Sequence, residues 1–183
     1  MDRKPLYAGA GAPRQRRSSG FTLVELIATI VVMGIMAAVG SSVISDTFTT
    51  VNVINRNQVV SSEARYAMER IAREIREMQY IGSAYVISSM TATNMVFTKG
   101  DGAIVTLNNS GANLTIAYST LSGVTATLSN KVDTSGFALT YLDVNGTTAS
   151  ASSLRYVQIQ LTLKDATTGF SSTQRSRVAV RNS

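Results

Sequence analysis

The chain has 183 residues, with 17 Lys and Arg residues, 11 Asp and Glu residues and a formal net charge of +6. It contains no cysteine and no histidine. Disulfide frameworks, thiolate nucleophiles and histidine-based zinc or acid-base sites are therefore excluded. The length suits a membrane segment plus one modest globular domain, and we do not expect an enzyme.

The first 20 residues form a polar, basic arm. They hold five of the 17 basic residues and one of the 11 acidic residues, with Arg14, Arg16 and Arg17 closest to the apolar stretch that follows. Basic residues just before an apolar segment keep that end in the cytoplasm. We therefore expect a disordered cytoplasmic arm and a body on the other side of the membrane.

The stretch from Gly20 to Ser45 is mostly apolar and has a single ionisable side chain, Glu25. At ~1.5 Å per residue, a helix from Leu26 to Ser45 is roughly 30 Å long, enough to cross a bilayer core. A carboxylate costs about 2.5–3.5 kcal/mol at the bilayer centre and less near the interface, and such groups are usually functional. The sequence thus predicts a membrane segment with a functional Glu25.

An amphipathic pattern follows Asp46. Ala64, Met68, Ile71 and Ile75 recur at spacings of four, three and four, and Met78 follows after three more. This spacing predicts one buried helical face.

The opposite face of this helix is charged. Glu69 and Arg73, and Arg73 and Glu77, are acid-base pairs four residues apart, each worth only ~0.2–0.5 kcal/mol. We interpret this face as solvated, with the two pairs formed along it.

No proline lies between Gly20 and Tyr80, which predicts one long helix. Gly34 and Gly40 are its weak points, each costing ~1 kcal/mol relative to alanine. The asparagine-containing stretch Val51 to Val60 is expected to be locally frayed.

From Gly82 onward the apolar period falls to two, which predicts strands. The predicted strands are Ala84 to Ser88, Asn94 to Thr98, Ala103 to Leu107, Asn113 to Ser119, Val124 to Leu128, Phe137 to Leu142, Leu154 to Leu163 and Arg175 to Val180. Asp101-Gly102 and Asn145-Gly146 predict tight hairpins. The fold class is therefore α+β: a long N-terminal helix whose amphipathic half packs on an antiparallel β-sheet.

The basic arm, then Gly20, then FTLVELIATIVVMGIMAAV resembles the N-terminal signature of type IV prepilins and type II secretion pseudopilins. The resemblance implies that a membrane peptidase cuts between Gly20 and Phe21, and that Phe21 is N-methylated. It places the family's glutamate at Glu25 and makes the apolar helix the core of a filament.

Residue by residue, the physics agrees with this resemblance. Glycine before the cut lets an extended backbone enter a crowded site. The new ammonium on Phe21 needs a counter-charge, which Glu25 supplies to its own chain or to the next subunit. The alternative is that Glu25 merely complements the positive helix N-terminus, at ~0.3–1 kcal/mol. We assign assembly contacts to Glu25, Leu23, Leu26 and Gly34.

Later segments resemble minor pilins and the J-type pseudopilin. These segments are SEARYAMERIAREIREMQ, FALTYLDVNG and LRYVQIQLTL, with a chain end near VRN. The resemblance implies a subunit present in few copies near a filament tip. Its partners would be other subunits, the prepilin peptidase and an inner-membrane assembly platform. The expected division is a cleaved leader (1–20), a membrane and filament-core helix (21–45), an amphipathic helix (46–81) and a β-rich domain (82–183).

Two other interpretations of the N-terminus stay open. An ordinary signal peptide would be cut after Ala38-Val39-Gly40, and a plain anchor would not be cut at all. The alternative function is a membrane-anchored extracytoplasmic binding module, an adhesin or a DNA receptor. An extracytoplasmic enzyme would need convergent carboxylates or a Ser-Lys pair.

Two smaller signals concern ligands. Asp143 to Gly146 has the start of a calcium-loop spacing, but a hairpin turn explains it better, and we expect no cofactor. Arg175, Arg177 and Arg181 near the chain end are able to meet DNA phosphates, but their alternation also protects an exposed edge strand. Nucleic acid is therefore not the expected partner.

Overall fold

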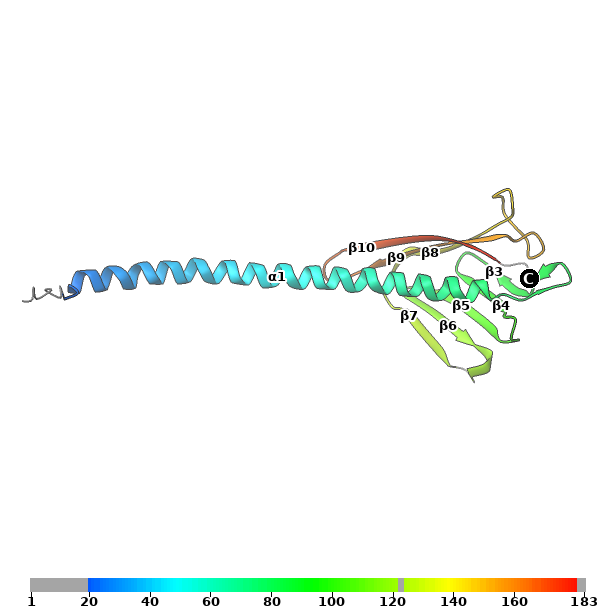
Figure 1. Ribbon diagram of the computed structural model, residues 1–183, viewed down its shortest axis with the longest axis horizontal. Coiled ribbons are helices and arrows are strands. Elements are labelled where there is room, and N and C mark those ends of the chain that lie inside the picture. The colour runs from blue at the N-terminus through cyan, green and yellow to red at the C-terminus, as the bar shows by residue number, and fades with distance from the viewer. Residues whose placement is uncertain (1–19, 122–123, 181–183) are drawn as a thin grey trace, which may run out of the picture. The chain divides into compact units, whose positions relative to one another are not determined.

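The computed structural model describes residues 20–121 and 124–180. One helix, α1 (Leu23–Arg76), precedes all the strands (Figure 1). The chain divides into two compact units, residues 1–47 and residues 48–183, and α1 contributes to both. The prediction of one long helix is confirmed, and residues 51–60, expected to fray, are helical throughout.

Helix α1 ends in a tightened last turn. The Glu77 N–H donates to the Glu74 carbonyl at 3.1 Å, a bond between residues three apart. The two short strands β1 (Tyr80–Ile81) and β2 (Ala84–Tyr85) then form a small two-stranded sheet. Gly82 turns the chain between them at a φ of 63°, a left-handed conformation that glycine adopts without strain.

The next five strands form one antiparallel sheet in chain order. They are β3 (Ile87–Met90), β4 (Asn94–Thr98), β5 (Ile104–Ser110), β6 (Asn113–Tyr118) and β7 (Thr125–Ser129), with the 3-10 helix η1 (Ser119–Leu121) after β6. The predicted turn at Asp101-Gly102 is confirmed: Gly102 has a φ of 85°, and the Ala103 N–H donates to Asp101 Oδ1 at 2.9 Å.

The last three strands form a separate antiparallel sheet in the order β10-β9-β8. They are β8 (Val132–Leu142), β9 (Tyr156–Lys164) and β10 (Ser171–Ala179). Strand β8 starts five residues before the predicted Phe137 because Val132 also pairs with β9, opposite Leu163, and the pairing register shifts between Val132 and Phe137. Gly136 lies in this irregular stretch, where a Cβ would come within 2.6 Å of the Thr162 carbonyl oxygen.

Helix α1 and both larger sheets share one hydrophobic core in the second unit. The five residues of the predicted helical stripe, Ala64, Met68, Ile71, Ile75 and Met78, are all buried. Strand β9 buries alternate residues, as its period of two predicts, from Val157 to Leu163. The stripe and the alternation together confirm the α+β prediction of a helix packed on antiparallel strands.

Three details of the prediction are wrong. The strands form three sheets instead of one. The turn at Asn145-Gly146 closes only the isolated bridge between Leu142 and Thr148, because the chain continues through residues 149–155 before β9 begins. Within the described residues, neither predicted pair through Arg73 forms an ion pair, and Glu77 instead pairs with Lys99, with 2.6 Å between Glu77 Oε2 and Lys99 Nζ.

Candidate functional site

The start of α1 is a capped helix N-terminus. The Glu25 backbone N–H donates to Thr22 Oγ1 at 3.3 Å, and the Leu26 N–H donates to the Thr22 carbonyl at 3.1 Å. Thr22 is therefore the N-cap residue, and Glu25 occupies the third helical position. Threonine followed three residues later by glutamate is the spacing of a capping box. Gly20 and Phe21 lie before the helix, in non-helical backbone.

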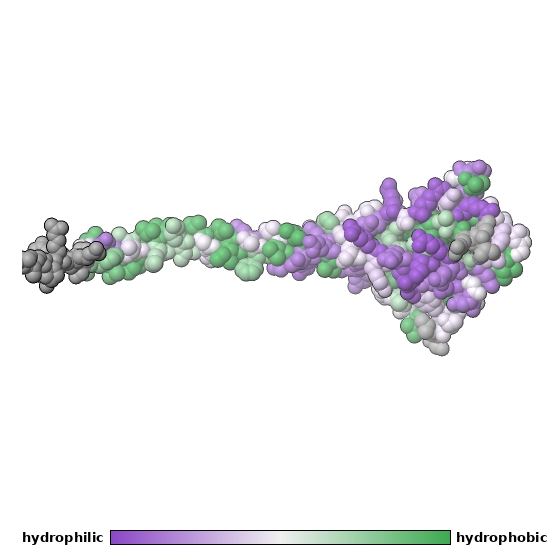
Figure 2. All heavy atoms as spheres, viewed as in Figure 1, coloured by the Kyte–Doolittle hydropathy of each residue, from purple (hydrophilic) through white to green (hydrophobic). Residues whose placement is uncertain are grey.

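The N-terminal part of α1 exposes apolar side chains in every direction. Leu23, Leu26 and Met33 have exposed fractions of 75%, 53% and 73%. Figure 2 shows hydrophobic residues over this part of the helix. Among the described residues, one helix, α1, is long enough and apolar enough to cross a membrane. An apolar surface of this extent requires lipid or other protein around it.

The few hydroxyl groups in this segment are satisfied within the helix. Thr29 Oγ1 donates to the Leu26 carbonyl at 2.8 Å, Ser42 Oγ to the Val39 carbonyl at 2.9 Å, and Thr47 Oγ1 to the Val43 carbonyl at 2.8 Å. Such bonds remove the cost of placing a hydroxyl in an apolar medium. These polar residues are compatible with a hydrocarbon environment.

The Glu25 carboxylate has no partner of this kind within the segment. Residues 20–47 contain no Lys or Arg, and none of the ion pairs among the described residues involves Glu25. An ionised carboxylate in an apolar setting is costly unless a cation pairs with it. Glu25 is therefore a group that requires a counter-charge from outside this part of the chain.

Small residues lie on one side of the same helix. Gly34, Ala38 and Ser42 are spaced by four residues, which places them on one face. A Cβ at Gly34 would meet nothing within 4 Å. Small residues at this spacing allow two membrane helices to approach closely. The segment thus combines an apolar surface, a close-packing face and one unpaired carboxylate.

Comparison with known families decides what this segment is. Residues 15–41 match the family described as "Prokaryotic N-terminal methylation motif". The chain carries a type IV prepilin-like signal. Proteins with this motif are structural, are cleaved by prepilin peptidase and assemble with other pilin subunits. A comparison with curated proteins finds no match, and a comparison with solved structures finds none either.

The predicted site residues group around the helix start, within the residues that match this motif. Gly20 and Phe21 lie just outside the helix, and Leu23, Glu25 and Leu26 lie in its first turn. Gly34 lies further along the same helix. The predicted leader residues Arg14, Arg16 and Arg17 lie outside the described residues. Sequence reasoning missed Thr22, although the Thr-x-x-Glu spacing was there to indicate a cap.

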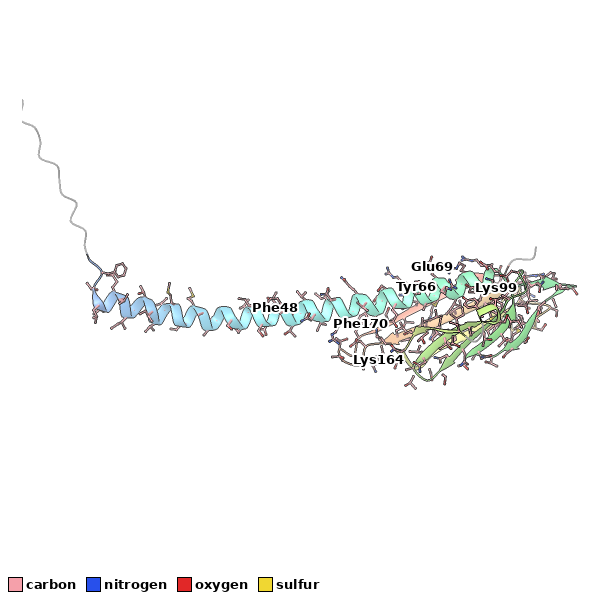
Figure 3. All side chains as sticks on the ribbon, turned by 90° about the horizontal axis from the view of Figure 1, so that it is seen from below. Phe48, Tyr66, Glu69, Lys99, Lys164 and Phe170 are labelled. Carbon is pink, nitrogen blue, oxygen red and sulfur yellow. The ribbon has the colours of Figure 1, made fainter. Side chains whose placement is uncertain are left out.

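A buried carboxylate in the second unit was also missed. Glu74 is 4% exposed, and its Oε1 accepts from the Tyr118 hydroxyl at 2.9 Å and pairs with Arg70 at 3.2 Å. Its Oε2 lies 3.1 Å from Lys99 Nζ, an ion pair without good hydrogen-bond geometry. Lys99 also contacts Glu77, and the Glu77 hydrogen bond raises the pKa of Lys99. Figure 3 shows Lys99 at the end of α1.

This cluster is structural in its chemistry. It joins α1 to the loop after β4 and to the end of β6, and each member has an opposite charge or a hydroxyl beside it.

Among residues 20–121 and 124–180, no three His, Cys, Asp or Glu residues are grouped so that they could hold a metal ion. The Asp143 carboxylate accepts hydrogen bonds from the N–H and hydroxyl groups of Thr147 and from the Asn145 N–H, and these bonds lower its pKa.

The arginines of β10 are held on the outer face of their sheet. Arg177 lies over the Tyr156 ring, with its Cζ 4.1 Å from the ring centroid. Arg175 Nε donates to Gln160 Oε1 at 3.0 Å. Both are exposed and lie on the β10 edge of the sheet, where charged side chains discourage pairing with other strands. Arg181 lies outside the described residues.

Proposed function

We propose that the protein is a minor structural subunit, without enzymatic activity, of a type IV pilus or a type II secretion filament. A prepilin peptidase would cut after Gly20, and Phe21 would be N-methylated. The observation that carries the proposal is an exposed apolar helix segment, within the methylation motif, whose single carboxylate, Glu25, has no Lys or Arg beside it in residues 20–47.

Glu25 has the chemistry of an assembly contact. Cutting before Phe21 creates an ammonium in an apolar setting that otherwise offers Glu25 no cation. Pairing the two charges between neighbouring subunits would fix the axial register of the filament, because an offset leaves both charges unpaired. Leu23, Leu26 and the small face at Gly34 would supply the surrounding helix contacts.

The second unit supports a role as a rigid subunit. Its core is closed by α1 and both large sheets, and its buried carboxylate is held by Arg70, Lys99 and Tyr118. The finer assignment, a minor subunit, rests on the resemblance of its later segments to minor pilins and the J-type pseudopilin. Before assembly the chain would be a single-pass inner-membrane protein with a cytoplasmic N-terminus, held at an assembly platform.

The mature N-terminus tests this proposal directly. Intact-mass and peptide mass spectrometry of the full chain from a host that expresses a prepilin peptidase should give an N-methylated Phe21. The same host without the peptidase is the control and should give the uncut chain. A start at Ser41 would indicate ordinary secretion, and an uncut chain in the presence of the peptidase would indicate a plain anchor. Either result would overturn the proposal.

A further inference from the structure

Thr22 caps the start of α1. Thr22 accepts the Glu25 N–H through its hydroxyl and the Leu26 N–H through its carbonyl, and Leu23 is the first helical residue. The peptide bond between Gly20 and Phe21 therefore lies two residues before the helix. A Cβ added at Gly20 would meet nothing within 4 Å. The bond that the proposed peptidase cuts lies in non-helical backbone.

Without this cap, we expect the helix to begin at an earlier residue. Phe21 and the residues after it are compatible with a helix, and Ser18 and Ser19 offer two hydroxyls of the type that caps helices a turn upstream. A helix capped at Ser19 would include both Gly20 and Phe21. A peptide bond inside a helix is protected until the helix opens locally. The position of the cap thus decides whether the Gly20–Phe21 bond is accessible.

We infer that Thr22 is a positioning residue for processing, which keeps the Gly20–Phe21 peptide bond outside the helix by fixing the helix start at Leu23. The inference rests on the proposed function, because it requires cleavage at this bond. The reaction itself is hydrolysis: the C–N bond breaks, and water supplies a hydroxyl to the Gly20 carboxyl and a proton to the Phe21 amine. Thr22 takes no part in that exchange.

The inference also gives Glu25 a second role before cleavage. Its backbone N–H is the donor that Thr22 binds, and a glutamate at the third helical position is the favoured partner of a threonine cap. The same residue pair would thus serve two successive steps. The Thr22 hydroxyl would first define the cutting position, and the Glu25 carboxylate would later pair with the amine that the cut creates.

The test compares cleavage rates of full-length chains by a purified prepilin peptidase in detergent micelles, followed by intact mass. Thr22→Val is nearly isosteric but cannot cap, and we expect roughly fivefold slower cleavage, in line with a typical N-cap contribution. Thr22→Ser and Thr22→Asn retain a capping oxygen and should be cut at nearly the wild-type rate. The matched control is Thr29→Val, which removes a hydroxyl bonded within the same helix, and its rate should be unchanged.

Hydrogen exchange distinguishes loss of the Thr22 cap from loss of a direct contact between Thr22 and the peptidase. In the uncut chains, the Glu25 amide should exchange faster in Thr22→Val, and the Phe21 amide should become more protected as the helix extends. Equal rates for Thr22→Val and wild type would overturn the inference. Slow cleavage of Thr22→Ser or Thr22→Asn, or slow cleavage of Thr22→Val without a change in exchange, would also overturn it. A wild-type chain that is not cut at all would instead overturn the proposed function.

Discussion

The two parts of helix α1 differ in the exposure of their apolar residues. Ile30 in the first unit is 61% exposed, whereas Ile71 in the second is 1% exposed. In the second unit the apolar residues form one stripe with charge on the other side, and that stripe is covered by strands of the same chain. In the first unit they surround the helix, and no residue in the described part of the chain covers them. The apolar residues of the second unit are covered by folding, whereas those of the first unit require lipid or other protein around them.

Two carboxylates on apolar parts of α1, Glu74 and Glu25, follow the same division. Glu74 lies among apolar residues with Arg70, Lys99 and Tyr118 from its own chain beside it. Glu25 lies in an apolar segment that contains no cation. An uncompensated carboxylate is costly in either place. The charged partners of Glu74 stabilise the fold, whereas Glu25 has no ion-pair partner among the described residues.

The largest effect is expected at Glu25. Glu25→Ala should reduce incorporation into filaments at least about tenfold, because the Phe21 ammonium then has no counter-charge in an apolar contact. The matched control is Glu69→Ala, on an exposed face of the same helix. Incorporation is measured by quantifying the protein in sheared or purified filaments against the membrane fraction. Normal incorporation of Glu25→Ala would refute the assembly role and favour the binding-module alternative.

The next largest effect is on the free energy of unfolding of the second unit, which should respond differently to the same substitution in the two parts of α1. Ile71→Ala should destabilise the second unit by roughly 2–5 kcal/mol, because it opens a cavity in a closed core. Ile30→Ala is the same chemical change in the first unit and should leave that free energy of unfolding unchanged. Hydrogen exchange of the strand amides in denaturant, on full-length protein in detergent, measures both. Similar losses for the two variants would mean that the two regions do not differ as described.

The smallest effect concerns the charged residues of the second unit. Glu74→Ala should cost about 1–3 kcal/mol, because Lys99 and the Tyr118 hydroxyl lose their buried partner. Glu69 points away from the strands, as does Tyr66 (Figure 3), and Glu69→Ala should stay within about 0.5 kcal/mol of wild type. The same exchange experiment measures both variants. Equal effects would show that the cluster at Glu74 contributes no more than a surface charge.

Most of the second unit was predictable from local pattern. The stripe from Ala64 to Ile75 and the alternation in β9 were both correct, because burial of one face imposes a period on the sequence. Partner choice was not predictable, because a period of two says which face is buried and not which strand lies alongside. The division into three sheets and the register shift near Gly136 depend on such pairings.

The charged face of α1 shows the same limit. Glu69, Glu74 and Glu77 occur in one charged stretch and look alike in sequence. Glu74 is buried and Glu77 pairs with Lys99 because the loop after β4 brings a lysine to the end of the helix. Spacing along the helix predicted pairs through Arg73, since only local partners are visible from the sequence. The lysine that pairs with Glu77 lies 22 residues beyond it in the chain.

The sequence by itself determined the candidate site: the basic arm, the bond between Gly20 and Phe21, the apolar segment and its lone Glu25 are local features that need no folded partner to be recognised. The position of the helix start was also encoded locally, in the spacing of Thr22 and Glu25. Only the tertiary structure decided which apolar residues are covered and which carboxylate is paired. The physical reason is that burial and ion pairing depend on contacts between segments far apart in the chain, and a local pattern contains no information about them.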